Sequence, residues 1–196
     1  MSAFAGPDTA TDLRRQFVRE DQLRLGLWMF LGSVTMLFAA FTSALVVRRS
    51  GTDWRPAIVP AMLWINTLVL GTSSVVLELA TGQGRRRRWR TAAVAAAGAL
   101  ALGIAFVIGQ FVAWKALAAQ GVYLSTNPSS SFFFMITGAH AVHVVAALIV
   151  LAWGAGITWS GYRNPRAWAA RFELCRTFWH YLGIVWLFLF LLIRSV

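Results

Sequence analysis

Apolar and polar positions fall in long separate blocks along the chain. Five stretches contain no Asp, Glu, Lys or Arg, and they cover 25–47, 56–77, 91–114, 116–162 and 177–193. A helix needs roughly 20 mainly apolar residues to cross about 30 Å of hydrocarbon, and each stretch can hold one crossing. The pattern predicts an all-α helix bundle in a membrane and argues against a soluble fold.

The fourth uncharged stretch is long enough to contain more than one element. Its segment 118–131 carries Gly121, Asn127-Pro128 and three consecutive serines, which is the composition of a turn or loop. We therefore expect one helix to end before this segment and another to begin after it. The predicted spans are 24–47, 56–80, 91–117, 132–159 and 173–193, in a membrane domain of 24–196 that follows an N-terminal segment of 1–23.

The basic residues between the spans predict the orientation. With the N-terminus inside, the outer segments hold five of the 18 basic residues, Arg48, Arg49, Arg55, Lys115 and Arg194, and the inner segments hold the other thirteen. The positive-inside rule then favours a cytoplasmic N-terminal segment and an outside C-terminus. The arginine run at 85–90 fits a short cytoplasmic loop. Residues 1–20 lack the apolar core and cleavage site of a signal peptide, so we expect the first span to be retained.

Composition removes two other classes of protein. A net charge of +11 is typical of nucleic-acid binding, but here the arginines lie between apolar runs, where headgroups attract them, so we expect no nucleic-acid partner. A single cysteine, Cys175, excludes an intrachain disulfide and is expected to be a core residue.

In the third span, small residues recur four apart at 99 and 103 and at 109 and 113, which predicts close helix packing.

Ionisable groups inside hydrocarbon are rare enough to be examined one by one. Glu78 lies within a turn of the inner end of its span, where its side chain can reach the interface. Glu173, Arg176 and His180 follow i, i+3 and i+7 on one helix face, so the first two can pair and His180 needs a partner within the bundle.

His140 and His143 lie three apart on the fourth span, and His143 is at a depth similar to that of His180. A bis-histidine haem between the fourth and fifth helices stays open, but neutral histidines bonded to neighbouring helices are favoured, since more ligands and embedded acids would be expected at a cofactor. Other polar side chains can bond across to another helix or back to the carbonyls of their own helix, namely Asn66, Thr67, Ser73, Ser74, Gln110 and Thr137. Nothing in this set forms a nucleophile and base or a carboxylate dyad.

Four motifs occur in chain order. They are Asn66-Thr67 with Ser73-Ser74, Gln110 with Trp114, the run TGAHAVHV at 137–144, and Glu173 followed by FWHY at 178–181 and VWLF at 185–188. Together they resemble the subunit III family of haem-copper respiratory oxidases, over about residues 24–193, in its short five-helix prokaryotic form.

The resemblance implies an accessory chain without catalytic residues, haem, copper or other metal of its own, in a prokaryotic inner membrane. It implies direct contact with catalytic subunit I, which reduces dioxygen and pumps protons, and association with subunit II and small subunits. It also implies two groups of helices around a V-shaped cleft that holds phospholipid. The residues that the motifs assign to structural, lipid or interhelix roles are Asn66, Thr67, Gln110, Trp114, Thr137, Gly138, His140, His143, Glu173, Trp179, His180 and Trp186.

The chain departs from the family pattern at two acids. Val34 follows Ser33 where the family often has an embedded glutamate, and Gly183 stands where an aspartate commonly follows the WHFV segment. Alternatives are a quinol oxidase subunit III, a subunit-III-like protein of nitric oxide reductase, and a small b-type cytochrome using His143 and His180. A small transporter is disfavoured because no broken helix or repeat symmetry is evident.

Overall fold

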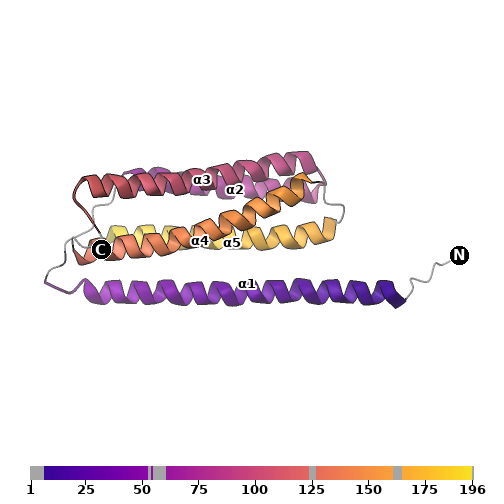
Figure 1. The fold of residues 1–196 in the computed structure, drawn as a ribbon, viewed down its shortest axis with the longest axis horizontal. Helices are drawn as coiled ribbons and strands as arrows, with labels where there is room; N and C mark the ends of the chain where they lie inside the picture. The colour runs from indigo at the N-terminus through magenta and orange to yellow at the C-terminus, as the bar shows by residue number, and fades with distance from the viewer. Residues whose placement is uncertain (1–6, 53, 55–60, 124–126, 161–164, 196) are drawn as a thin grey trace.

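In a computed structural model, the structure describes residues 7–52, 54, 61–123, 127–160 and 165–195, with side chains from Asp21 onward except at 166 and 167. Five helices account for almost all of these residues, and no strand occurs among them. The helices are α1 (Pro7–Arg48), α2 (Met62–Arg85), α3 (Trp89–Ala119), α4 (Pro128–Trp159) and α5 (Pro165–Ser195), shown in Figure 1.

All five helices are long and apolar enough to cross a membrane. The qualifying segments are Asp21–Arg48, Met62–Arg85, Trp89–Ala119, Pro128–Trp159 and Trp168–Ser195. This confirms the predicted all-α fold with five membrane-spanning helices. The start of α1 and the end of α5 lie at opposite ends of the bundle (Figure 1). Which end faces the cytoplasm stays a prediction, and so does the cytoplasmic placement of 1–23.

The helices run past the predicted spans because an uncharged pattern marks hydrocarbon rather than helical backbone. α1 begins at Pro7, well before the predicted start at 24, and α5 begins at Pro165 rather than at 173. The predicted start of the second span, at 56, lies outside the described residues. α3 and α4 begin at Trp89 and Pro128, close before the predicted starts at 91 and 132.

Two connections follow from local chemistry. Arg87 has a positive φ of 58°, and the backbone N–H groups of Arg87 and Arg88 donate to the carbonyls of Gly84 and Gln83 at 2.9 and 3.0 Å. This closes α2 with a tight turn into α3 at the expected position.

At the start of α4, the Asn127 side chain accepts from the Ser130 N–H at 2.9 Å. Pro128 next to this cap fixes the helical φ of the first turn.

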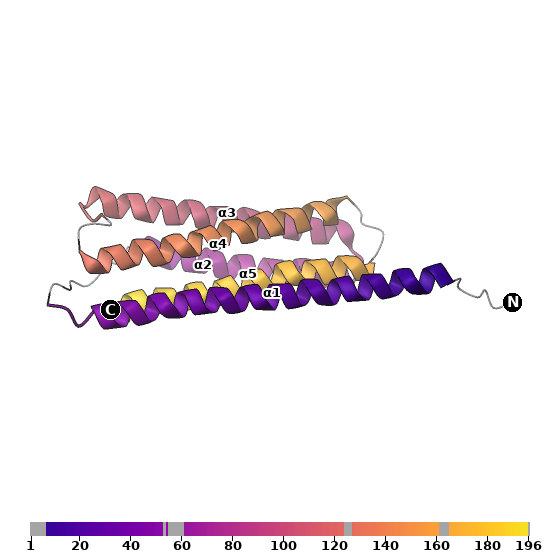
Figure 2. The same ribbon diagram turned by 60° about the horizontal axis from the view of Figure 1, so that its bottom comes forward.

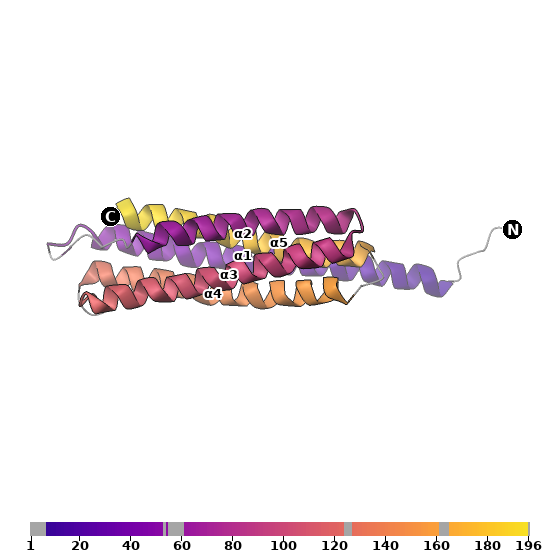
Figure 3. The same ribbon diagram turned by 90° about the horizontal axis from the view of Figure 1, so that it is seen from above.

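α2, α3, α4 and α5 form a four-helix group, in which α2 packs on α3 and α5, and α4 packs on α3 and α5. α1 contacts only α4 and α5 among the described helices. Figure 2 shows α1 running alongside α5, and Figure 3 shows it behind the other four helices. The helices therefore divide into a group of four and a single helix, while the V-shaped lipid cleft stays a prediction.

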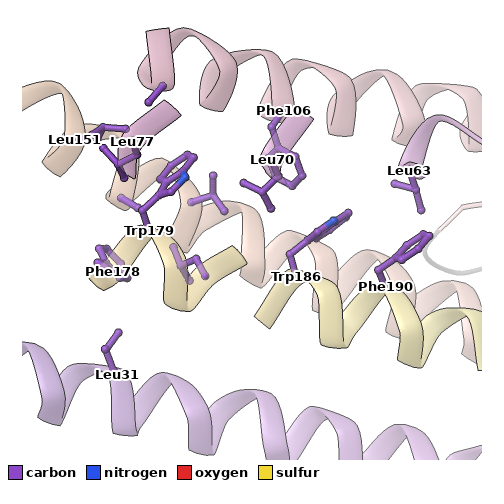
Figure 4. Close-up of a cluster of buried hydrophobic side chains, with 14 of the residues drawn as sticks. Leu31, Leu63, Leu70, Leu77, Phe106, Leu151, Phe178, Trp179, Trp186 and Phe190 are labelled. Carbon is purple, nitrogen blue, oxygen red and sulfur yellow. The ribbon is translucent and has the colours of Figure 1, made fainter. Parts of the chain in front are cut away.

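The core of the four-helix group is built on large side chains from α5. Trp179, Trp186 and Phe190 point from α5 toward the helices opposite, with Leu70 and Phe106 among the residues that they meet (Figure 4). The small residues of α3 admit these rings at close range, as the sequence predicts. A Cβ at Gly103 would meet the Trp179 ring and Leu148, and one at Gly109 would meet the Asn66 side chain.

Candidate functional site

Two hydrogen bonds join helix pairs through tryptophan indoles. Trp186 Nε1 on α5 donates to Thr67 Oγ1 on α2 at 3.1 Å, and Trp114 Nε1 on α3 donates to Thr137 Oγ1 on α4 at 3.2 Å. Each threonine hydroxyl donates in turn to the carbonyl four residues earlier in its own helix. The hydroxyl oxygen therefore accepts an N–H from a second helix while its proton remains satisfied.

His140 lies between the same helices and is 1% exposed. Its ring centroid is 5.3 Å from that of Trp186, and it meets Phe106 of α3 and Phe38 of α1 edge-on at 6.4 and 6.2 Å. Neither ring nitrogen has a hydrogen-bond partner among the described residues. The expected hydrogen bond from this histidine to a neighbouring helix is therefore not made, because aromatic rings surround it.

His143 and His180 face different helices. His143 Nδ1 donates to the Ala139 carbonyl of its own helix at 2.7 Å, and its ring lies against Phe30 and Phe38 of α1. The expected bond of His143 to another helix is thus replaced by a bond within α4. His180 Nε2 instead meets Glu78 Oε1 of α2 at 2.8 Å. These contacts do not bring the two histidines together as a haem pair.

The two amides of the motifs are buried in the four-helix group. Asn66 packs against Gly109 of α3, and Gln110 follows Gly109 with 3% exposure. Asn66 Nδ2 and both polar atoms of Gln110 have no partner among the described side chains and backbone. Within the described structure, Gln110 therefore makes neither of the expected bonds, to another helix or to a carbonyl of its own helix. Gly138, another motif residue, has open space where a Cβ would be.

A charged cluster joins α2 to α5. Glu173 pairs with Arg176 within α5, as the spacing predicts, and Arg176 also reaches Glu78 Oε2 of α2 at 3.2 Å. Arg85 of α2 meets Glu173 at 3.3 Å. His180 completes the cluster through Glu78, so it finds the partner that its depth requires.

Sequence reasoning missed the link of Glu78 to α5. It placed the carboxylate at the interface, which stays a prediction; in the structure the side chain is 48% exposed and faces Arg176 and His180. The available signal was the sign of the charges, since Glu78 and Arg176 are oppositely charged residues near the ends of two apolar spans. No group of three or more His, Cys, Asp or Glu side chains with metal-binding geometry occurs in the described part of the chain.

A groove of about 590 Å³ opens beside this cluster, between α1 and α5. α1 contributes Arg24, Leu27 and Trp28, and α5 contributes Glu173 and Thr177 together with two alanines and a leucine. Arg85 of α2 closes one side. Two guanidinium groups beside an indole and an aliphatic side chain suit an amphiphile with an anionic head.

The fold and this interior define a multi-pass helical membrane protein that uses its embedded polar residues to join helices. The model of the family described as cytochrome c oxidase subunit III matches residues 8–195. The chain belongs to that family. It is therefore a subunit III of a haem-copper oxidase, which is an oxidoreductase complex, and it associates with other oxidase subunits.

Individual relatives agree with the family. The chain is similar to cytochrome c oxidase subunit 3 of Thermostichus vulcanus, with 29% identity over 177 residues that cover 86% of this chain and 85% of the relative. It is 27% identical to the probable cytochrome c oxidase subunit 3 of Mycobacterium tuberculosis, with 91% and 90% covered. It is also 28% identical to the quinol oxidase subunit 3 of Bacillus subtilis, with 85% and 83% covered.

Proposed function

We propose that this chain is the non-catalytic accessory subunit of a cytochrome c oxidase that reduces dioxygen to water and pumps protons. The observation that carries the proposal is the family match over 8–195, together with an interior whose polar side chains are engaged in packing between helices. A bacterial cell membrane is the proposed location, because the relatives named above are bacterial.

Haem and copper belong to the partner subunits in this proposal. The supporting observation is how the three histidines are used, since His140 lies among aromatic rings, His143 bonds to its own helix and His180 bonds to Glu78. A stand-alone b-type cytochrome would need two of these rings directed at one iron. Pyridine haemochrome analysis of the full chain separated from its complex tests this, and stoichiometric haem would overturn the proposal.

Catalytic subunit I is the proposed direct neighbour, with subunit II and small subunits in the same complex. The described faces of α1 and of the bundle expose large apolar side chains, including Trp28, Met29, Met36, Trp64 and Ile184. Lipid or another membrane subunit can cover such surfaces. Mass spectrometry of the purified native complex identifies the neighbours, and recovery of the chain without an oxidase subunit would contradict the proposal.

Bound phospholipid is the proposed occupant of the groove between α1 and α5. Arg24 offers a cation to a phosphate, and so does Arg85 beside its ion pair with Glu173, while Leu27 and Trp28 offer apolar surface to the glycerol and upper chains. Lipid mass spectrometry of the complex with Arg24→Gln should show less retained phospholipid than wild type. Arg49→Gln, an exposed arginine near the opposite end of α1, is the matched control.

The electron donor distinguishes the proposed cytochrome c oxidase from its main alternative, a quinol oxidase. The Bacillus subtilis relative is named a quinol oxidase subunit, so a quinol-oxidising complex is the second candidate. A subunit-III-like protein of nitric oxide reductase is the third. Purification of the native complex, its optical spectrum, and its activity with reduced cytochrome c, quinol and nitric oxide distinguish the three candidates.

A further inference from the structure

The four-helix group contains a layer of polar and aromatic side chains, contributed by α2, α3, α4 and α5. We call it the polar–aromatic layer, and it consists of the buried Asn66, Gln110, Thr137, His140 and Trp186 and the half-buried Thr67 and Trp114. The two indole–threonine bonds satisfy the polar groups of Trp114, Thr137, Trp186 and Thr67. Amide groups and the imidazole of the layer remain without hydrogen-bond partners among the described residues.

The contacts place these leftover groups at one level of the bundle. Gln110 is one turn from Phe106 and one turn from Trp114 on α3, so the three share a face. Phe106 contacts His140, and Trp114 bonds to Thr137, which is one turn from His140 on α4. Gln110 therefore lies on the face of α3 that meets α4, one turn from the residue that contacts the imidazole.

α2 and α5 close the same layer. Asn66 packs against Gly109, the residue before Gln110, and the next residue of α2, Thr67, accepts the indole N–H of Trp186. The Trp186 ring lies 5.3 Å from the imidazole of His140. Asn66, Gln110 and His140 thus lie on three helices near the level of Trp186 on the fourth.

Five polar atoms in this layer have no hydrogen-bond partner in the described part of the chain: Asn66 Nδ2, Gln110 Nε2 and Oε1, and His140 Nδ1 and Nε2. In hydrocarbon each such atom is costly, because bulk water cannot reach it. The set also mixes donors with acceptors, since amide nitrogens donate, the amide oxygen accepts, and a neutral imidazole does one of each.

We infer that the polar–aromatic layer is a binding site for ordered water molecules held between Asn66, Gln110 and His140. Water offers two donors and two acceptors, which complements this mixed set, and buried waters typically make about three hydrogen bonds. Since one water partners at most four groups, five atoms require at least two molecules. Water in this position bridges α2, α3 and α4 where direct side-chain bonds do not.

Radiolytic hydroxyl-radical labelling of the native complex, read by mass spectrometry, tests the inference, because radicals formed from bound water mark the nearest side chains. Phe106 and Phe178 are both buried, at 1% and 5% exposure, but Phe106 lies in contact with the layer and Phe178 packs on Phe30 of α1. We expect Phe106 to be labelled several-fold faster than Phe178. Equal or slower labelling of Phe106 would overturn the inference.

A matched pair of variants locates the water. Gln110→Leu removes two of the five atoms and should reduce the labelling of Phe106 toward that of Phe178, while the exposed Gln120→Leu should leave it unchanged. If Gln110→Leu does not assemble, the wild-type comparison decides alone. A density map of the complex that resolves waters gives an independent outcome: water density between the Gln110 amide and the His140 ring supports the site, and the absence of such density overturns it.

Discussion

A buried indole N–H in a membrane has few acceptors, because the backbone carbonyls nearby are already used by their own helices. Thr67 and Thr137 supply one without opening a helix, since each hydroxyl keeps its proton on its own backbone. The geometry gives each tryptophan a fixed rotation against its neighbouring helix. These two threonines therefore fix the rotation of α5 relative to α2 and of α3 relative to α4 about their helix axes.

A double-mutant cycle measures one of these bonds. Trp186→Phe retains a ring against Phe106 and His140 but loses the N–H, and Thr67→Val loses the acceptor. We expect a coupling of about 0.6 kcal/mol in the free energy of unfolding, the usual size for a polar contact between membrane helices. Denaturant unfolding in detergent provides the values.

The control for that cycle is Trp159→Phe combined with Thr67→Val, because Trp159 is 73% exposed and lies on α4. This pair should show additive effects. A coupling near zero for Trp186 and Thr67 would mean that the indole bond adds nothing to the packing of its ring.

Motifs identified the members of the polar–aromatic layer but not their partners. Helical periodicity places Trp114 and Gln110 on one side of a helix, yet it does not tell which helix lies opposite or how that helix is rotated. His140 shows the limit most clearly, since hydrogen bonding was expected and aromatic rings were found. Which residue pairs with Thr137 depends on how all four helices of the group pack together, and no local sequence pattern contains that information.

At the level of helices, α3 and α2 approach closely because α3 presents small residues to its neighbours. Alanine or glycine stands at each of the four positions that the sequence singled out, and all four are buried. In lipid, close approach supplies the dispersion contacts that replace a hydrophobic driving force. Adding volume on this face should therefore cost more than adding volume elsewhere on the same helix.

Gly109→Ala tests this with a matched control. The new methyl group would overlap the side chain of Asn66, which is itself buried, so we expect a loss of about 1–3 kcal/mol in the free energy of unfolding, as for overpacked cores. In Gly98→Ala the methyl would lie 3.6 Å from Val76, an ordinary contact. That variant should be neutral or slightly stabilising, since alanine favours helix.

The charged cluster fastens α5 to α2 near one end of the bundle. Glu173→Ala removes the shared partner of Arg85 and Arg176, and we expect a loss of about 1 kcal/mol or less, because all three groups are partly exposed. Thermal release of this chain from the complex, followed by subunit content, is the measurement. Asp21→Ala, an exposed acid of α1, is the control, and an equal effect of both would contradict a specific role for the cluster.

Over the whole molecule, the number and class of the helices could be predicted because hydrocarbon thickness imposes them on any sequence. The separation of α1 from the other four could not, since its apolar pattern resembles theirs. The lengths of α1 and α5 were also missed, because helical backbone continues into polar sequence at Pro7 and Pro165.

Orientation is testable on the intact chain by thiol labelling. Cys175 is buried, so a new cysteine gives the accessible thiol among the described residues. Arg87→Cys, in the α2–α3 turn, should react with a membrane-impermeant maleimide in inverted vesicles, and Gln120→Cys, after α3, should react in right-side-out vesicles. The reverse result would place the N-terminus outside.

The position of α1 has a consequence for synthesis. Its contacts are with the last two helices, as in the hydrogen bond between Thr35 and Tyr181, 146 residues apart. During translation α1 therefore enters the bilayer before its partners exist, and its own backbone hydrogen bonds must sustain it there. The hydroxyls of Ser33, Thr35 and Thr42 donate to carbonyls of α1 itself. The newly inserted helix therefore satisfies these polar groups before any other helix is present.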